Sequence, residues 1–348
     1  MSDHGEDPAP TANGTTAPFS NRLDASNSTF PDEIAANDII SRANYIYSFL
    51  AALGFVAGCF LLYTFAQTHR THRTHRPPAW LDRLLWAFCG LQLLLLLLSL
   101  HAVAHRPQYL RTTAVGCAAL SFAINAASLC SLSVLGLMAY VLTLGPPAHA
   151  LLGKPRVSAA LVILTSALGA LLLAGLRGTA GHLQGVGRCS MDPVEAGPPY
   201  AAARLCLASL LPFACQAGLL MGGCVRQWKT KGRCLSGAEE GPVYLAVALV
   251  AFFCQLFYGV ALVRGARPHG PAQPRERAFL AVAELVLFSG SGASLLLVLL
   301  VHRACREGLR GAFRRLRDCW RGPGGAQPHR NIIAPHIEIT DTLQDYEA

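Results

Sequence analysis

Seven long apolar runs, separated by short polar or basic segments, dominate this chain. Each run has the length of about 20 residues that an α-helix needs to cross the hydrocarbon core of a bilayer. The runs lie near residues 43–67, 84–105, 113–144, 156–177, 201–226, 242–264 and 278–302. A run that crosses lipid must be helical, because lipid offers no partner for an exposed backbone N–H or C=O. The pattern predicts an all-α membrane protein built as a bundle of seven transmembrane helices.

The third run is the most polar, which predicts its place in the bundle. Small polar side chains allow helices to approach closely and to form hydrogen bonds with one another. Those of the third run are Ser121, Asn125, Ser128, Ser131 and Ser133. We expect this helix to be buried among the others.

The segments outside the runs divide the chain into four parts. Residues 1–38 are polar, with no hydrophobic periodicity, and predict a disordered tail. The seven-helix bundle is expected over 39–302, followed by an amphipathic helix over 303–320 and a polar tail over 321–348.

The amphipathic segment predicts a helix that lies on the inner face of the membrane. Leu309, Phe313, Leu316 and Trp320 recur on one side, and arginines take much of the rest. Such a helix binds membrane lipids through its apolar side and anionic headgroups through its basic side. Cys319, near its end, is a candidate palmitoylation site, with a free interfacial thiol as the alternative.

The C-terminal tail carries candidate phosphorylation sites at Thr340 and Thr342, which stand among acidic residues. Phosphate there would add negative charge that an arrestin-type adaptor binds. The alternative is a solvated acidic end with no such role.

Composition supports the membrane assignment. The chain is 52% hydrophobic and 14% charged with a mean hydropathy of +0.37, whereas a soluble chain has about 25% charged residues. The net charge of +9 does not indicate a nucleic-acid partner, because the basic residues gather at the ends of the apolar runs. Basic residues in this position mark the cytoplasmic side of a membrane protein.

The distribution of basic residues and of glycosylation sequons predicts the orientation. Most of the 29 lysine and arginine residues fall on the side of the C-terminus. The opposite side holds two sequons, which predict glycans on Asn13 and Asn27. We expect a multi-pass protein of the plasma membrane with its N-terminus outside the cell.

No sequence pattern indicates an enzyme, a metal site or a cofactor. The chain has no nucleophile elbow, no HExxH, no P-loop and no Cys/His spacing suited to zinc. Glu284 is the single acidic residue within an apolar run. A carboxylate in the membrane is costly and by default functional, so Glu284 is a candidate ligand contact. The alternative is a glutamate near the rim that reaches water or an arginine.

Several local motifs resemble those of rhodopsin-type G-protein-coupled receptors. Cys117 opens the third run, Cys189 stands in the following outer loop, and Pro212 lies within the fifth run. The stretch Phe253-Cys254-Gln255-Leu256-Phe257-Tyr258 is similar to the switch motif of helix six in that family. Together with Glu284-Leu285-Val286-Leu287-Phe288-Ser289, it looks most like chemokine receptors and atypical or orphan receptors.

This resemblance implies a set of site residues and a class of partner. It implies a disulfide between Cys117 and Cys189, and a ligand cavity lined by Glu284, Tyr258 and Gln255. The ligand would be extracellular, with a basic peptide or a chemokine as the class that the resemblance favours.

Two family motifs are missing at the inner ends of the helices. Aligned on Pro146, the D-R-Y position of the third helix is Met138-Ala139-Tyr140; spacing from Cys117 instead places it about three residues later, where no arginine lies either. The N-P-x-x-Y position of the seventh helix falls at Ser294-Leu295-Leu296-Leu297-Val298. The missing arginine predicts weak coupling to a heterotrimeric G protein, with arrestin as another partner. An alternative is a non-signalling decoy or chaperone receptor. A transporter or channel ranks lower, because internal repeats and intramembrane charged relays are absent from the sequence.

Overall fold

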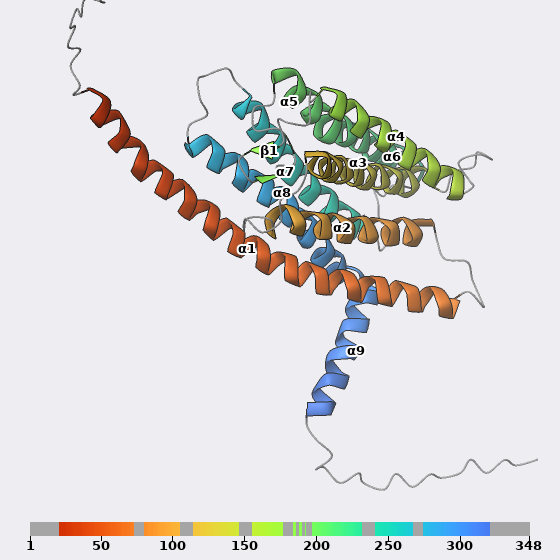
Figure 1. The fold of residues 1–348 in the computed structure, drawn as a ribbon. Helices are drawn as coiled ribbons and strands as arrows, with labels where there is room; N and C mark the ends of the chain where they lie inside the picture. Colours follow the sequence, from red (N-terminus) through yellow and green to blue (C-terminus); the bar gives the residue numbers. More distant parts are fainter. Residues whose placement is uncertain are drawn as a thin grey trace, which may run out of the picture. The chain divides into compact units, whose positions relative to one another are not determined.

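The computed structural model describes residues 21–72, 80–104, 114–145, 155–176, 184–185, 188–189, 192, 197–231, 241–266 and 274–320. The chain divides into two compact units, residues 1–306 and 307–348, which are considered separately. The elements are α1 (Asn21–His72), α2 (Trp80–Ala104), α3 (Ala114–Leu144), α4 (Pro155–Leu176), β1 (Gln184–Gly185), β2 (Arg188–Cys189), α5 (Pro198–Leu205), η2 (Cys206–Leu210), α6 (Leu211–Lys231), α7 (Gly241–Gly265), α8 (Pro274–Val301) and α9 (Arg303–Trp320) (Figure 1).

Among the described residues, seven helical segments are long and apolar enough to cross a membrane, which confirms the predicted fold class. They are Ile34–Gln67, Trp80–Leu100, Val115–Leu144, Arg156–Leu176, Pro198–Arg226, Gly241–Gly265 and Ala278–Val301. The fifth consists of α5, η2 and α6 in succession. This part of the chain is a seven-helix membrane bundle.

The long first helix corrects the predicted boundary of the N-terminal tail. Helix α1 begins at Asn21, within the segment 1–38 that was expected to be disordered. Its early turns place Ala36 and Ile40 four residues apart, where both are buried against Ala278 of α8. These contacts hold this part of α1 against α8, because packing of an apolar face supplies most of the stability of a helix in a protein. The remaining residues of the tail, 1–20, lie outside the described part.

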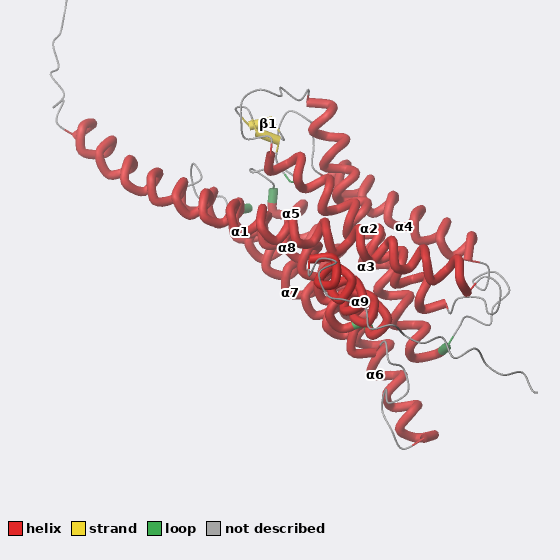
Figure 2. Tube along the Cα trace, turned by 90° about the horizontal axis from the view of Figure 1, so that it is seen from below, coloured by secondary structure: helices red, strands yellow, loops and turns green. Residues whose placement is uncertain are grey.

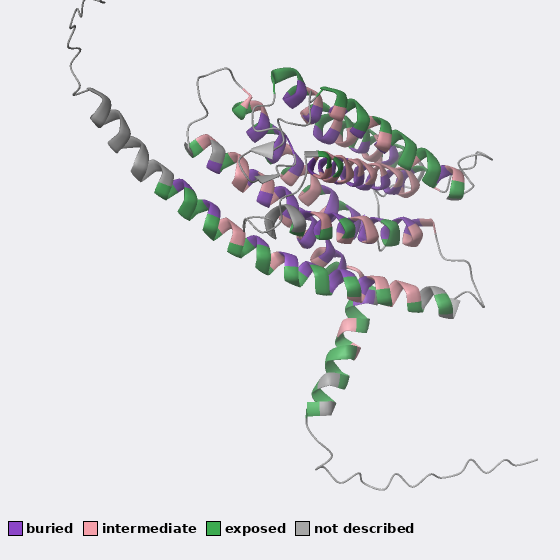
Figure 3. Ribbon diagram, in the orientation of Figure 1, coloured by how far each residue is buried: buried purple, intermediate pink, exposed green. Residues whose placement is uncertain are grey.

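Helix α3 lies at the centre of the bundle, as its polar side chains predict. It packs against α2, α4, α6 and α7. In Figure 3 buried residues line the faces between helices, and exposed residues cover much of α4. Large apolar side chains on the outer face of α4, such as Ile163 at 62% and Leu164 at 56% exposed, suit a surface covered by acyl chains.

Small residues set the closest helix contacts. A Cβ placed on Gly54 of α1 would lie 2.6 Å from the Cα of Gly292 on α8. On the far side of the bundle, a Cβ on Gly223 of α6 would lie 2.5 Å from the Cβ of Thr143 on α3. Glycine at these positions lets the two backbones touch, which is how helices associate tightly in lipid.

The fifth span contains one turn of wider helix. Leu211 donates its backbone N–H to the carbonyl of Cys206, five residues earlier, instead of four. Pro212 follows directly, and a proline ring clashes with the carbonyl four residues before it in a regular α-helix. The π-helical turn η2 relieves that clash and sets the direction of α5.

The strand pair marks one end of the bundle. Strands β1 and β2 are antiparallel, with Gln184 opposite Cys189 and Gly185 opposite Arg188. Figure 2 shows this pair in yellow at an end of the helical bundle. We call it the strand end, where α3, α5 and α8 begin; α2, α4 and α7 begin at the opposite end.

In the second unit, the helix expected over residues 303–320 is α9 (Arg303–Trp320), although its first residues belong to the bundle unit. Phe313 is 62% and Trp320 is 88% exposed. Arg310, Arg314 and Arg317 are exposed as well. The side chain of Cys319 and all residues from 321 onward, including Thr340 and Thr342, lie outside the described part, so their modification stays a prediction.

Candidate functional site

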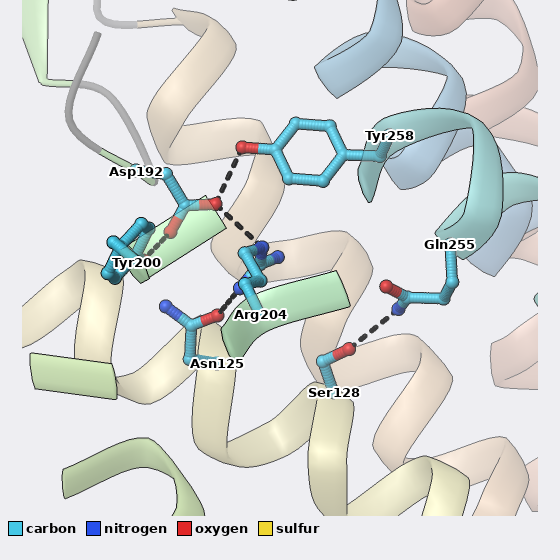
Figure 4. A network of polar contacts seen from close by, with 7 residues as sticks. All are labelled: Asn125, Ser128, Asp192, Tyr200, Arg204, Gln255 and Tyr258. Carbon is cyan, nitrogen blue, oxygen red and sulfur yellow. Dashed lines mark hydrogen bonds and ion pairs between the residues drawn. The ribbon is translucent and has the colours of Figure 1, made fainter. Parts of the chain in front are cut away.

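A buried ionic cluster at the strand end joins one loop residue to three helices (Figure 4). We call Asp192, Tyr200, Arg204, Asn125 and Tyr258 the Arg204 cluster. Asp192 follows β2, Tyr200 and Arg204 lie on α5, Asn125 on α3 and Tyr258 on α7. Helices α3, α5 and α7 are far apart in the sequence, so only the folded bundle brings their side chains together.

The carboxylate of Asp192 is saturated with donors. Its Oδ2 lies 2.8 Å from Nε of Arg204 and accepts a hydrogen bond from the Tyr258 hydroxyl at 2.6 Å. Its Oδ1 accepts a hydrogen bond from the Tyr200 hydroxyl. Asp192 is only 3% exposed, so these bonds replace the water that a carboxylate needs.

The guanidinium of Arg204 is held on several sides. Its Nη1 donates a hydrogen bond to Oδ1 of Asn125. Its Cζ lies 5.0 Å from the centre of the Tyr258 ring, a cation–π distance. The residue is 2% exposed, and a buried arginine is tolerable only when it is paired in this way.

Glu284 of α8 brings a second carboxylate into the range of the cluster. It is half-buried, and its charge is the smallest of those that act on Arg204, after Asp192, Tyr258 and Tyr200.

A second polar layer lies deeper in the bundle. Gln255 lies one turn before Tyr258 on α7 and donates from Nε2 to the Ser128 hydroxyl at 2.8 Å. Both line a cavity of about 40 Å³, together with Gln92 and Ser131, which are joined by a hydrogen bond of 2.7 Å. Neutral polar groups and this volume suit bound water.

The three side chains predicted to line a ligand cavity occupy neighbouring positions. Tyr258 belongs to the Arg204 cluster, Glu284 acts on it electrostatically, and Gln255 lies one turn deeper. The arrangement fits one polar region that runs from the strand end toward the middle of the bundle. Their contact with a ligand stays a prediction.

The central members of the cluster, Asp192 and Arg204, were missed by the sequence argument. Arg204 carried a signal, because a charged residue inside an apolar run is a functional candidate by default. Asp192 carried none, since an aspartate in a loop is ordinary until the fold buries it. Asn125 was read only as a packing residue of the third helix.

Of the two cysteines in the predicted disulfide, the structure describes the side chain of Cys117. Cys117 is buried at the start of α3 and is disulfide-bonded. The side chain of Cys189 lies outside the described side chains, so their pairing stays a prediction. The side chains of the two sequon residues, Asn13 and Asn27, also lie outside the described part.

The opposite end of α3 is apolar at Met138 and Ala139, the segment that the resemblance aligns with the D-R-Y motif. Met138 and Ala139 are 2% and 0% exposed, and Ser294 and Val298 of α8 are equally buried. Within the described residues, the grouping of histidine, cysteine and acidic side chains needed to hold a metal ion is also absent. The Arg204 cluster is therefore the strongest candidate site in the described bundle. No protein-family model and no curated protein matches this chain.

Proposed function

We propose that this protein is a plasma-membrane receptor of the G-protein-coupled-receptor type, which binds an extracellular ligand at the strand end of its bundle. The observation that carries the proposal is the buried Arg204 cluster. A buried charged network costs stability unless its partners are well placed. It occupies the end at which the strand pair packs, which is where a ligand entering from one side of the membrane would meet three helices at once.

The orientation supports an extracellular ligand. With the N-terminus outside, the strand end faces the exterior, and the basic segments fall on the cytoplasmic side. The two sequons at Asn13 and Asn27 agree with that orientation.

The charges near the site favour a ligand with a basic group. Asp192 and Glu284 are two acids around the single Arg204. Asp192 is almost completely buried and out of reach of a ligand, whereas Glu284 is half-buried at the edge of the cluster. We therefore assign Glu284 as the anchor for a basic peptide or chemokine, with Tyr258 beside it and Gln255 beneath.

Signalling through a G protein is expected to be weak. The inner end of α3 presents the buried Met138 and Ala139 where receptors of this type carry an arginine. The same feature favours a second candidate function, a decoy or chaperone receptor that takes up ligand or recruits arrestin without activating a G protein.

A binding screen tests the proposal. Cells expressing the full chain are exposed to a library of chemokines and basic peptides, and binding is read with G-protein and arrestin biosensors alongside a labelled-ligand assay. For a ligand that binds, Glu284→Gln should weaken the affinity roughly tenfold or more, since it removes one partner of a desolvated charge pair.

Glu276→Gln is the matched control, because Glu276 lies in the first turn of the same helix and outside the cluster. It should leave the affinity unchanged. If Glu284→Gln binds the ligand as tightly as the native protein and Glu276→Gln do, the assignment of Glu284 is wrong. Arrestin recruitment without a G-protein response would favour the decoy function.

A further inference from the structure

A groove of about 340 Å³ lies on the outside of the bundle between α2, α3 and α4. Its volume is within the range of roughly 300–1,000 Å³ typical of small-molecule sites. It is formed by the first turns of α2 and α4 and the second half of α3, so it lies toward the end opposite the strand pair. It shares no residue with the Arg204 cluster.

The lining of the groove fits a hydrocarbon chain. Apart from Arg83, Ser158 and Cys130, its walls are apolar or aromatic. The groove opens sideways, since Ile163 and Ala159 on its rim are exposed. These rim residues belong to membrane-spanning segments, so acyl chains rather than water lie against the opening.

One end of the groove carries positive charge. Arg83 and Trp80 line it in the first turn of α2, both half-buried. Arg156 is exposed in the first turn of α4. Because both helices begin here, the partial positive charge at their N-termini adds to that of the arginines.

Asp82, the acidic residue of the same turn, does not line the groove. Its charge acts on Cys305, at the start of α9. Arg83 is therefore the charged side chain of this turn that lines the groove. Trp80 completes a membrane-interface arrangement, since tryptophan favours the level of the lipid headgroups.

We propose that this groove binds an anionic glycerophospholipid, with one acyl chain between α2, α3 and α4 and the headgroup phosphate at Arg83. Guanidinium binds phosphate through parallel hydrogen bonds, and the apolar walls replace the neighbouring lipids around the chain. In the orientation proposed above, the headgroup lies in the cytoplasmic leaflet, where anionic lipids are enriched. The site does not depend on the receptor function.

Fluorescence quenching by brominated lipids tests this proposal. A variant with Trp86→Phe, Trp228→Phe and Trp320→Phe keeps Trp80 as its single tryptophan. The full chain is placed in phosphatidylcholine nanodiscs containing phosphatidylglycerol with brominated chains, or brominated phosphatidylcholine of the same chain length. Quenching of Trp80 should be half-maximal at a roughly fivefold lower mole fraction of the anionic lipid, the preference expected of one basic residue near the surface.

Two variants on the same background separate the headgroup contact from general damage. Arg83→Gln should abolish the preference, and Arg83→Lys should retain most of it. Arg70→Gln is the control, because Arg70 is an exposed arginine at the same end of the bundle, on α1. Size-exclusion profiles verify that each variant is folded.

Three results would overturn the proposal. Equal quenching by the two lipids would exclude an anionic headgroup site. A preference that survives Arg83→Gln would place the headgroup elsewhere. Quenching relieved by cholesterol at a lower mole fraction than by unlabelled phosphatidylglycerol would identify a sterol as the occupant.

Discussion

Among single residues, Asp192 and Arg204 are the two buried charges whose desolvation costs free energy, and their ion pair holds the strand end together. Each is almost completely buried, and each neutralises the other across 2.8 Å. The tyrosine hydroxyls and Asn125 complete their hydrogen bonds. The pair fixes the position of a loop residue against α5 and α7, and with it the shape of the strand end.

Removing one member of this pair should destabilise the protein strongly. Asp192→Asn leaves Arg204 buried without its counter-charge, and such a change costs about 3–5 kcal/mol. Arg204→Gln should cost a similar amount. The measurement is thermal unfolding of the purified protein in detergent.

The double variant Asp192→Asn with Arg204→Gln should recover a large part of the loss, because neither charge is then left alone. The control is Asp38→Asn, which breaks an exposed ion pair with Arg42 and should change the unfolding temperature little. Additive losses in the double variant would show that the two side chains do not stabilise each other.

Cys305 gives a prediction that depends on pH. Burial raises the pKa of its thiol to about 11, and the charge of Asp82 adds to the rise. Only the thiolate reacts with alkylating reagents, so Cys305 should stay unmodified by iodoacetamide at pH 7.5 and react as the pH approaches 11. In the unfolded chain, where a cysteine pKa is about 8.5, alkylation should be complete near pH 9.

Peptide mass spectrometry of the folded and denatured protein measures the modification of Cys305. Labelling of the folded protein at pH 7.5 as fast as that of the denatured protein would contradict the buried position. Slow labelling would also make Cys305 a poor palmitoylation site compared with Cys319.

At the scale of helices, the contact between α1 and α8 depends on the smallest side chain. Gly54 and Gly292 leave the two backbones so close that a methyl group has no space. A Cβ on the neighbouring Gly58 would lie 3.0 Å from Cδ1 of Leu93 and 3.1 Å from Cδ1 of Leu295, closer than ordinary contact. Side chains can move aside where a backbone cannot, so Gly54 is the more restrictive position.

Alanine at Gly54 and at Gly136 should have opposite effects. Gly54→Ala forces α1 away from α8 and should destabilise the protein by about 1–3 kcal/mol. Gly136 lies in α3, and a Cβ added there by Gly136→Ala would meet no neighbouring helix within 4 Å. It should be neutral or stabilising by up to about 1 kcal/mol, since alanine favours a helix more than glycine does.

The measurement is the unfolding temperature of each variant relative to the native protein. If both variants lose the same amount, the effect comes from replacing glycine in a helix and not from the contact. If Gly54→Ala unfolds at the native temperature, α1 and α8 do not pack as closely as described.

The helices themselves differ in how far sequence predicts them. Apolar length is enough to place α2, α4 and α7 within a few residues of their ends. The start of α1 was missed because residues 1–38 are polar and show no hydrophobic periodicity. The wide turn η2 before Pro212 was also missed, because a proline in a span predicts that the helix is distorted but not whether it kinks or forms a π-helical turn.

On the scale of the whole molecule, the bundle could be predicted and its central ion pair could not. Lipid imposes a simple length rule on every span, whereas the meeting of Asp192 with Arg204 depends on how a loop folds back into the bundle. Tyr258 was found through a motif resemblance, and Glu284 through the same resemblance and as the single acidic residue of an apolar run. Both signals give residue types but no contacts. The site therefore required the three-dimensional arrangement of α3, α5, α7 and α8.

The receptor proposal requires the strand end of the bundle, with the Arg204 cluster, to face the outside of the cell. The most direct test is a topology measurement on intact cells that express the chain with an epitope after Ala348. The account predicts glycans on Asn13 and Asn27, seen as a glycosidase-sensitive mobility shift, and an epitope that is stained only after permeabilisation. An epitope stained on intact cells, with no glycan on either asparagine, would place the cluster on the cytoplasmic side and contradict the receptor function.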